Sequence, residues 1–379
     1  MKRSPVTFEE KTPAGMINLG IGQPSDDLLP VELIRKATEV FFASAQPQDL
    51  NYGPREGDLR FRASLAKFLC RNYGRPVDSE ALFLTGGNSQ ALDMACSHFS
   101  RPGDTIFVEE PSYFLAYQIF TDHGLNIVSV PVDHEGLDID ALEATIATTK
   151  PTLLYTIPSY QNPTGRTMSF SRRKRLVELS RKHDFMILAD EVYQVLSFTD
   201  SPPDAIGTMA DSGNVCSLGS FSKILAPGLR LGWIQTTREN VRRLNRSGAV
   251  SSGGSLNHFT SHIVRHAIDM GLLQSHLHQL RLSYRNRVAV MDYALNKYLS
   301  RHATWTRPHG GYFFWLTMEN KNSNTQKLLS NARKAGVGFQ PGELFSSTGG
   351  MADHIRLSFA RYDENGIQEG IARLASVIK

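Results

Sequence analysis

Short apolar runs alternate with amphipathic segments along most of the chain. Helical patterns occur at Val31–Ala43, Tyr113–Thr121, Ile139–Thr148 and Ser171–His183. The runs that have the length and character of strands are Ala81–Leu84, Thr105–Val108, Ile127–Val130, Leu153–Ile157, Phe185–Ala189, Val215–Leu218 and Leu231–Gln235. Continuous apolar strands separated by helices predict an α/β fold, in which a mostly parallel seven-stranded sheet is flanked by helices on both faces.

The pattern changes after about residue 275. A long helical pattern at Leu277–Ser300 leads to the apolar segment Gly310–Leu316 and a mixed tail, which together predict a smaller α+β domain with an antiparallel sheet. Glycines and prolines interrupt any periodicity in residues 1–30. We therefore expect an N-terminal segment (1–44) that packs with the small domain, a large domain (45–275) and the small C-terminal domain (276–379).

Composition and charge are those of an ordinary globular protein and argue against a nucleic-acid partner. The chain has 379 residues, is 41% hydrophobic and 21% charged, and carries a net charge of +4, which is ordinary for a globular protein. The densest basic run, Arg172–Arg175, begins a predicted helix, and a solvated face is its simplest interpretation. No basic patch is interleaved with aromatic residues, so we do not expect a nucleic-acid partner.

Cysteine usage and hydropathy suggest a compartment. The three cysteines, Cys70, Cys96 and Cys216, are too few and too scattered for a disulfide framework or a zinc site, and no metal is expected. No window approaches eighteen apolar residues, and residues 1–11 lack the apolar core of a signal peptide. These features predict a cytoplasmic protein without a membrane span.

Two glycine-containing loops carry candidate chemistry. The segment Thr85–Ser89 joins a strand to a helix, an arrangement that forms an anion site, although an ordinary turn with a serine cap would look the same. After the strand at Val215–Leu218, the loop Gly219–Arg230 contains two hydroxyls, Lys223 and an arginine. A lysine at the mouth of a sheet can act as an amine nucleophile, and hydroxyls with an arginine suit a phosphate. Pyridoxal phosphate has both an aldehyde and a phosphate; the alternative is a solvated surface lysine.

Polar side chains follow three of the predicted strands. Asn162, Asp190, Tyr193 and Lys223 come after strands that we expect to be parallel, so they should meet at one edge of the sheet, where open α/β sheets bind ligands. Asp190 could keep the ring nitrogen of the cofactor protonated, and Tyr193 and Asn162 could donate to its phenolic oxygen. Taken singly, these three residues could equally be a helix N-cap, a packing tyrosine and a turn residue.

Together these motifs resemble a known family. Ser-Phe-Ser-Lys-(five residues)-Leu-Arg-Leu-Gly from Ser220, Asn-Pro-Thr-Gly from Asn162 and Asp-Glu-Val-Tyr from Asp190 are similar to the class I/II aminotransferases of the fold-type-I pyridoxal-phosphate enzymes. The resemblance extends from about Gly20 to the C-terminus. Asn-Tyr-Gly-Pro, Gln-Asn-Pro-Thr-Gly and Gly-Gly-Tyr-Phe-Phe-Trp point to the branch with 2-aminoadipate, kynurenine and aromatic aminotransferases.

The resemblance implies a role for each cofactor-site residue. Lys223 would form the Schiff base (internal aldimine) and later move the proton between substrate and cofactor, Asp190 would pair with the pyridine nitrogen, and Tyr193 and Asn162 would bond the phenolic oxygen. Tyr113 would stack on the ring, although a core tyrosine is the alternative. The residues that would bind the phosphate are Gly87, Asn88, Ser89, Ser220, Ser222 and Arg230.

It also implies substrate contacts and a partner. Tyr52 would reach the phosphate of a neighbouring subunit, which implies a homodimer with shared sites. Arg356 would clamp the substrate α-carboxylate, near Asn162 and Gly22. An arginine among apolar strand residues is costly unless it pairs with an anion, and an internal salt bridge is the alternative.

The sequence departs from the family pattern in the phosphate loop, which has Gly-Gly-Asn-Ser-Gln where the family often has Gly-Ser-Gln-Gln. This puts the role of the Asn88 side chain in doubt but not the site. The segments Gly20–Ser25 and Ser251–Asn257, where the family sets side-chain specificity, offer no second arginine, which disfavours an aspartate-type substrate.

The resulting prediction is a pyridoxal-phosphate-dependent aminotransferase of amino-acid metabolism. It would move an amino group from an L-amino acid to a 2-oxo acid by a ping-pong mechanism. The alternatives are a C–S β-lyase or another enzyme on the same cofactor, and, more remotely, a non-catalytic sensor domain of a transcription regulator. The fold-like pattern begins within about thirty residues of Met1, which leaves little room for a DNA-binding head before it.

Overall fold

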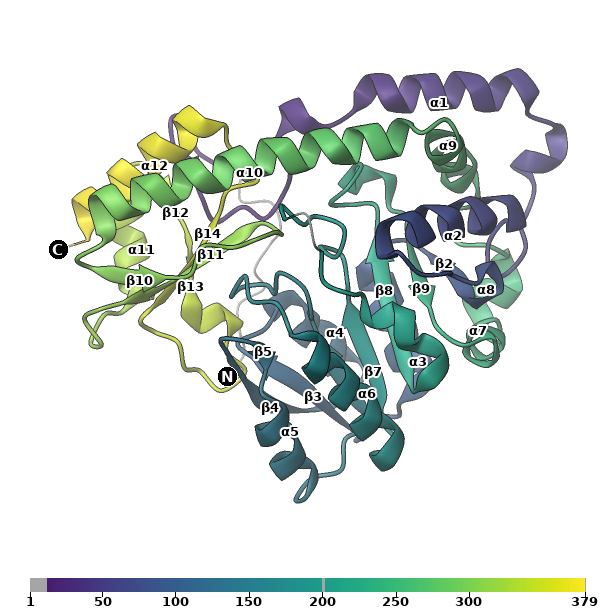
Figure 1. Ribbon diagram of the computed structural model, residues 1–379, viewed down its shortest axis with the longest axis horizontal. Helices are drawn as coiled ribbons and strands as arrows, with labels where there is room; N and C mark the ends of the chain where they lie inside the picture. The colour runs from purple at the N-terminus through teal and green to yellow at the C-terminus, as the bar shows by residue number, and fades with distance from the viewer. Residues whose placement is uncertain (1–11, 200–201, 379) are drawn as a thin grey trace.

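A mixed eight-stranded sheet forms the centre of the protein (Figure 1). The structure is a computed structural model and describes residues 12–199 and 202–378. In spatial order the strands are β2 (Leu82–Thr85), β9 (Gly232–Gln235), β8 (Val215–Ser220), β7 (Met186–Asp190), β6 (Leu153–Thr156), β3 (Thr105–Glu110), β4 (Asn126–Asp133) and β5 (Gly136–Leu137). The strands β8, β7, β6, β3 and β4 pair in parallel, whereas β9 is antiparallel to both its neighbours and β5 to β4.

Helices cover both faces of this sheet. They are α2 (Leu59–Tyr73), α3 (Asn88–Phe99), α4 (Phe114–Asp122), α5 (Ile139–Ile146), α6 (Phe170–His183) and α7 (Arg238–Leu244). Successive strand residues point to opposite faces. Ile106 and Val108 of β3 thus pack with α2, α3 and α4, whereas Phe107 packs with α5 and α6. The predicted α/β class is confirmed, and each of the seven expected strands is present; the two-residue β5 is too short to leave a pattern.

The C-terminal part contains the expected antiparallel sheet. Its strands, in spatial order, are β10 (Ala303–Trp305), β11 (Phe313–Met318), β14 (His354–Ser358) and β13 (Gln340–Pro341). The helices α11 (Thr325–Lys334) and α12 (Glu364–Val377) pack beside it, and β1 (Ile17–Asn18) pairs in parallel with β12 (Val337–Gly338). The helix α10 (Leu272–Leu299) begins five residues earlier than the pattern indicated and crosses the molecule towards this sheet (Figure 1).

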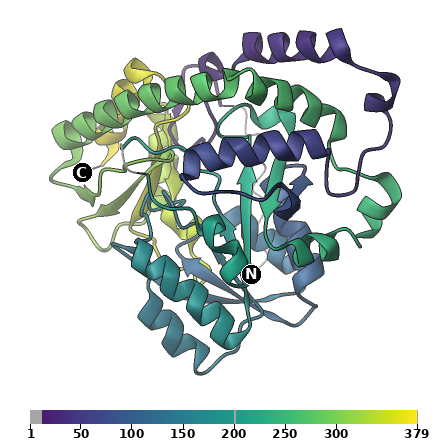
Figure 2. The ribbon, with the colours of Figure 1, turned by 45° about the vertical axis from the view of Figure 1, so that its right-hand side comes forward.

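Near the N-terminus, α1 (Val31–Ser44) packs against α9 (His258–Asp269), and the short α8 (Gly248–Gly253) precedes α9. Figures 1 and 2 both show α1 at the rim of the molecule, with no element on its outer side. Residues 12–30 contain only β1 and a 3-10 turn at Asp26–Leu28, as the interrupted pattern predicts; residues 1–11 lie outside the described part. The domain limits at 44 and 275 stay a prediction.

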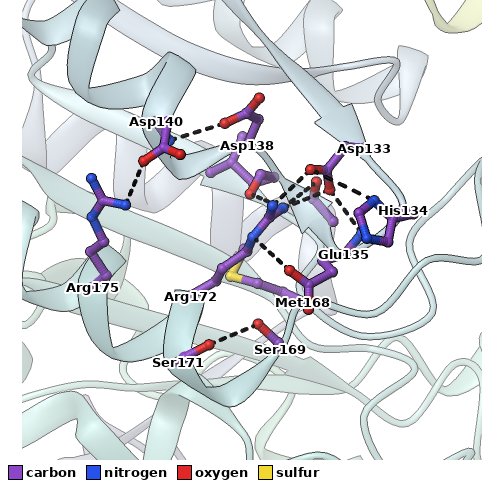
Figure 3. Close-up of polar contacts among 12 residues, drawn as sticks. Asp133, His134, Glu135, Asp138, Asp140, Met168, Ser169, Ser171, Arg172 and Arg175 are labelled. Atoms are coloured by element: carbon purple, nitrogen blue, oxygen red, sulfur yellow. Dashed lines mark hydrogen bonds and ion pairs between the residues drawn. The ribbon is translucent and has the colours of Figure 1, made fainter.

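The basic run at the start of α6 is solvated only in part: Lys174 and Arg175 are exposed, whereas Arg172 is half-buried and Arg173 is buried. Arg172 donates from both terminal nitrogens to the Asp133 carboxylate, at 2.6 and 2.7 Å, and Arg175 donates to Asp140 at 2.6 Å (Figure 3). Arg173 is fully buried and donates to the Pro158 carbonyl at 2.7 Å. The prediction was therefore wrong for Arg173, because the carbonyls of the loop after β6 satisfy its guanidinium.

Candidate active site

The predicted site residues lie at the carboxyl edge of the parallel strands. Asp190 is the last residue of β7, and Lys223 and Asn162 lie in the loops that follow β8 and β6. Because Thr156 pairs with Ala189 and Asp190 pairs with Leu218, the three strand ends are level. The parallel register therefore brings the three loops to one place, as expected from the sequence.

The Asp190 carboxylate is buried and held by neutral donors. The Tyr155 hydroxyl donates to Oδ2 at 2.8 Å, and the Asn88 side-chain amide donates to Oδ1 at 2.7 Å. Burial raises the pKa of Asp190 to about 6, although these hydrogen bonds and the charge of Lys223 favour the ionised form. The carboxylate is thus a buried group whose ionised form would stabilise a protonated nitrogen placed beside it.

The Lys223 amine is desolvated. Its Nζ donates to the Gly22 carbonyl at 2.8 Å and lies 5.4 Å from the centre of the Tyr312 ring. Burial, followed by repulsion from Arg356, lowers the pKa of Lys223 to about 8, while Asp190 acts in the opposite direction. A sizeable fraction of the amine is therefore neutral near physiological pH. The neutral form is the one that can attack a carbonyl carbon.

Arg356 is a buried cation on β14. Its Nη1 donates to Asn162 Oδ1 at 3.0 Å and its Nη2 to the Gly20 carbonyl at 2.6 Å, while Nε is buried and has no partner in the part of the chain that the structure describes. Within residues 12–199 and 202–378 no carboxylate forms an ion pair with it, so the internal salt bridge considered from the sequence is not present there. Burial lowers the pKa of Arg356 to about 10. A buried arginine without an anion is an incomplete site for a carboxylate.

Aromatic side chains line the same region. The Arg356 guanidinium lies 4.2 Å from the Phe313 ring centre and 4.9 Å from that of Phe345. Tyr193 is buried beside Phe313, with ring centres 5.9 Å apart. Burial raises the pKa values of both Tyr193 and Tyr113, and the charges of Asp190 and Arg356 act on both phenols. The two phenols are therefore neutral hydrogen-bond donors next to these charged groups.

The start of α3 and the loop after β8 carry donors that suit a phosphate monoester. The helix α3 begins at Asn88, and Gly87 before it has φ of +94°. A φ of this sign strains any other residue, and a Cβ on Gly87 would also displace Arg230 Nη2, which lies 2.9 Å from that position, so glycine keeps this guanidinium beside the helix N-terminus. Ser220 donates to Ser222 at 2.9 Å in the same loop, and Ser89 is exposed in the first turn of α3. Backbone amides, hydroxyls and an arginine are the donors that a phosphate dianion requires.

The positions of three further predicted residues bear on the roles assigned to them. The Asn88 side chain contacts Asp190 rather than the predicted phosphate position, so only its backbone amide stays a candidate there. Gly22 contributes its carbonyl to Lys223, and a Cβ on Gly22 would lie 3.0 Å from Phe313. Tyr52 is 82% exposed in the segment between α1 and α2.

Sequence reasoning missed several buried polar residues that support the site. Tyr155 sits in an apolar strand run and reads as core, yet its hydroxyl bonds Asp190. Glu109 on β3 accepts from Gln161 Nε2 at 3.0 Å and from the Ile157 amide at 3.1 Å, and burial raises its pKa to about 7. Gln161 also donates to the Pro111 carbonyl at 2.7 Å. These bonds fix the loop that carries Asn162 against the loop that precedes Tyr113. Glu109, directly after the strand predicted at Thr105–Val108, and Tyr155, within the strand predicted at Leu153–Ile157, were the available signals.

The electrostatics at Lys223 predict opposite effects of two substitutions. In cofactor-free protein, the pH dependence of acylation of Lys223 by an amine-specific reagent, followed by mass spectrometry, should have a midpoint near pH 8. Arg356→Gln removes a repelling charge and should raise this midpoint, whereas Asp190→Asn removes an attracting charge and should lower it. A midpoint near the ordinary lysine value of about 10.4, or shifts of the same sign, would contradict the account.

Comparison with known proteins identifies the family. The family described as "Aminotransferase class I and II" matches residues 14–374. "Aromatic-amino-acid aminotransferase 1" of Thermococcus litoralis is 36% identical over 369 residues, which cover 96% of this chain and 88% of that protein.

Solved structures agree. The kynurenine aminotransferase of Pyrococcus horikoshii, in complex with PMP, is 33% identical with a TM-score of 0.90, covering 97% of this chain and 91% of that one. LysN, the α-aminoadipate aminotransferase of Thermus thermophilus, complexed with N-(5'-phosphopyridoxyl)-L-leucine, is 30% identical with a TM-score of 0.88, covering 99% and 95%. The chain therefore belongs to the class I and II aminotransferases, the pyridoxal-phosphate-dependent family that its motifs resemble.

Proposed function

We propose that this aminotransferase moves the amino group of an aromatic or other large apolar L-amino acid to a 2-oxo acid. The observation that carries the proposal is Arg356, a buried guanidinium without a carboxylate partner in the described residues, close to a lysine of lowered pKa and packed between aromatic rings. Pyridoxal phosphate, when bound, supplies the electron-withdrawing ring and the carbonyl that takes up the amino group. The residues of this chain supply binding, orientation and proton movement.

Lys223 has the properties of the covalent anchor and of the proton carrier. Its amine is neutral often enough to bond an aldehyde carbon, since its pKa is about 8. Once the amine is released by an incoming amino acid, it can hold a proton at Nζ and pass it to or from the substrate α-carbon. The Gly22 carbonyl, which accepts from Nζ at 2.8 Å, gives the released amine a defined position.

The remaining predicted residues would hold the ring and the phosphate. Asp190 would keep the pyridine nitrogen protonated, while Tyr193 and Asn162 would donate to the phenolic oxygen and Tyr113 would lie against the ring face. The phosphate would bind at the N-terminus of α3, where the helix dipole favours an anion. The other phosphate ligands would be the side chains of Ser220, Ser222 and Arg230, with the backbone of Gly87, Asn88 and Ser89.

Arg356 would bind the substrate α-carboxylate. A carboxylate that accepts from two guanidinium nitrogens forms a planar, charge-assisted pair, and Nε is buried with no partner among the described residues. The desolvated surroundings strengthen such a pair, because no water screens it. The same pair orients the α-carbon toward Lys223.

The aromatic lining supports a large apolar side chain on the substrate. Phe313 and Phe345 flank Arg356, and the Gly22 backbone approaches Phe313. The aromatic and kynurenine aminotransferases among the relatives point the same way. The absence of a second arginine in Gly20–Ser25 and Ser251–Asn257 disfavours substrates with a second carboxylate.

An amino-donor screen tests the proposed reaction. With 2-oxoglutarate as the acceptor, we expect phenylalanine, tyrosine or kynurenine to have a kcat/KM at least about tenfold above aspartate, which corresponds to about 1.4 kcal/mol of differential transition-state binding. Arg356→Lys, which keeps the charge but not the planar fork, should raise the KM for every donor. Release of ammonia and pyruvate from cysteine conjugates without an oxo acid would instead support a β-lyase. A preference for aspartate would contradict the proposed substrate class.

We also propose that the protein works as a homodimer in the cytoplasm. Exposed large apolar side chains lie on or between α1, α2 and α9: Val31, Phe42, Leu50, Tyr52, Leu59 and Phe259. Phe42 and Phe259 are neighbours, with ring centres 6.1 Å apart. An apolar face that includes Tyr52 suits a second copy of the chain, whose site Tyr52 would then reach.

The proposed compartment rests on the cysteines. The free thiols Cys70, Cys96 and Cys216 suit a reducing compartment, and no helix in the described residues is long and apolar enough to cross a membrane.

Analytical ultracentrifugation tests the dimer. We expect twice the chain mass at micromolar concentration, and loss of that species in a Leu50→Glu/Leu59→Glu variant, because a charge buried without a partner is costly. An exposed substitution away from this face, Tyr293→Glu on α10, is the control and should leave the mass unchanged. A monomeric parent protein would contradict the dimer proposal without affecting the assignment of the reaction.

A further inference from the structure

Asn88 is one of the residues at which the phosphate loop departs from the family pattern. Its side chain contacts Asp190, a contact that the family pattern did not predict. The amide nitrogen Nδ2 donates to Asp190 Oδ1 at 2.7 Å and to the Leu218 carbonyl at 3.4 Å. The amide oxygen Oδ1 is buried and has no partner among the described residues. Because the amide oxygen of Asn88 is unpaired, the hydrogen bonds of its amide nitrogen must hold the side chain in place. Of the two acceptors of that nitrogen, the Asp190 carboxylate is stronger than the Leu218 carbonyl.

A second donor holds the other oxygen of the same carboxylate. The Tyr155 hydroxyl, fully buried on β6, donates to Asp190 Oδ2 at 2.8 Å. One donor comes from the first residue of α3 and the other from a central strand, so the plane of the carboxylate is fixed from two independent elements. The Val192 amide approaches Oδ1 at 3.5 Å and adds a weaker contact.

The ionised state of Asp190 depends on these donors. Burial works against the charge, and the hydrogen bonds from the Tyr155 hydroxyl, the Val192 backbone amide and the Asn88 side chain work for it. The other titratable groups that act on Asp190 are Lys223 in the loop after β8, Glu109 on β3, Tyr113 before α4 and Tyr193 after β7. Lys223 is the single cation among them, and it is also the group that would be consumed by bonding the cofactor. When the cofactor is bound, the neutral donors would add to the stabilisation that a protonated ring nitrogen gives the carboxylate.

We propose that Asn88 and Tyr155 are positioning residues that act through Asp190, holding its carboxylate ionised and in a fixed plane toward the pyridine nitrogen of the cofactor. Asn88 also joins the two ends of the cofactor site, because its backbone amide opens the phosphate-binding helix and its side chain bonds Asp190. The inference rests on the proposed function, which places Asp190 at that nitrogen.

The test measures cofactor retention against pH in the holoenzyme. The cofactor's visible absorbance band is followed during acid titration in the parent protein, Asn88→Ser and Tyr155→Phe. Loss of one donor should raise the pKa of Asp190, so the midpoint of cofactor release should move to higher pH by about one unit, with about tenfold weaker cofactor binding at neutral pH. Tyr117→Phe is the matched control, because it also removes a buried tyrosine hydroxyl, one that donates to the Phe345 carbonyl at 2.9 Å, and it should keep the parent midpoint.

Competition with inorganic phosphate shows whether a variant affects the phosphate end or the ring end of the cofactor site. Asn88→Ser keeps the backbone amides of α3, so competition by phosphate against cofactor rebinding should be unchanged while cofactor affinity falls. Equal losses for phosphate and cofactor would overturn the inference, because the effect would then lie at the phosphate end.

The remaining outcomes are distinguishable. A parent protein that binds pyridoxal phosphate while both variants titrate like Tyr117→Phe would overturn the inference and leave the proposed function intact. A parent protein without any cofactor band would overturn the proposed function itself. If Tyr155→Phe does not fold, as judged by circular dichroism, Asn88→Ser at the partly exposed start of α3 decides alone.

Discussion

The parallel pairing of β6, β7 and β8 is the constraint on which the candidate site depends. Three strands that run the same way with level ends must place the loops that follow them at one edge. The edge then holds Asn162, Asp190 and Lys223, although these residues are far apart in the sequence. β14 of the small sheet adds Arg356 from the opposite side, through its hydrogen bond to Asn162. The site is therefore built between the two sheets.

Desolvation gives this edge its chemistry. Asp190, Lys223 and Arg356 are each shifted toward their neutral forms by burial, and each is modified by the charges of the others. The result is an amine that titrates near pH 8, an anion that needs neutral donors, and a cation that lacks an anion in the described residues. Perturbed groups of this kind cluster where a protein binds and transforms ligands. An anionic substrate would pair with the Arg356 guanidinium, and a protonated ring nitrogen would pair with the Asp190 carboxylate.

Much of this arrangement could be predicted from the sequence, for a physical reason. Continuous apolar strands alternate with helices, so the parallel sheet and the convergence of Asp190 and Lys223 followed from pattern alone. The contacts of Asn88 and Tyr155 with Asp190 could not be predicted. The neighbouring sequence does not show which residue a side chain at a helix start or in a buried strand will contact. Arg173 was misinterpreted for a similar reason, since its pattern does not show that the Pro158 and Asp204 carbonyls, 15 and 31 residues away, accept from its guanidinium. Polar side chains in apolar strands, such as Glu109 and Tyr155, were the signal to follow.

The most direct test of the account is to locate the cofactor on the chain. Borohydride reduction of the holoenzyme, followed by proteolysis and mass spectrometry, should find the cofactor attached to the peptide that contains Lys223 and to no other. The Lys223→Ala variant, checked for folding by circular dichroism, should carry none. Attachment to a different lysine, or a modified peptide that persists in Lys223→Ala, would contradict the assignment of Lys223 and, with it, the site built around the carboxyl edge of the sheet.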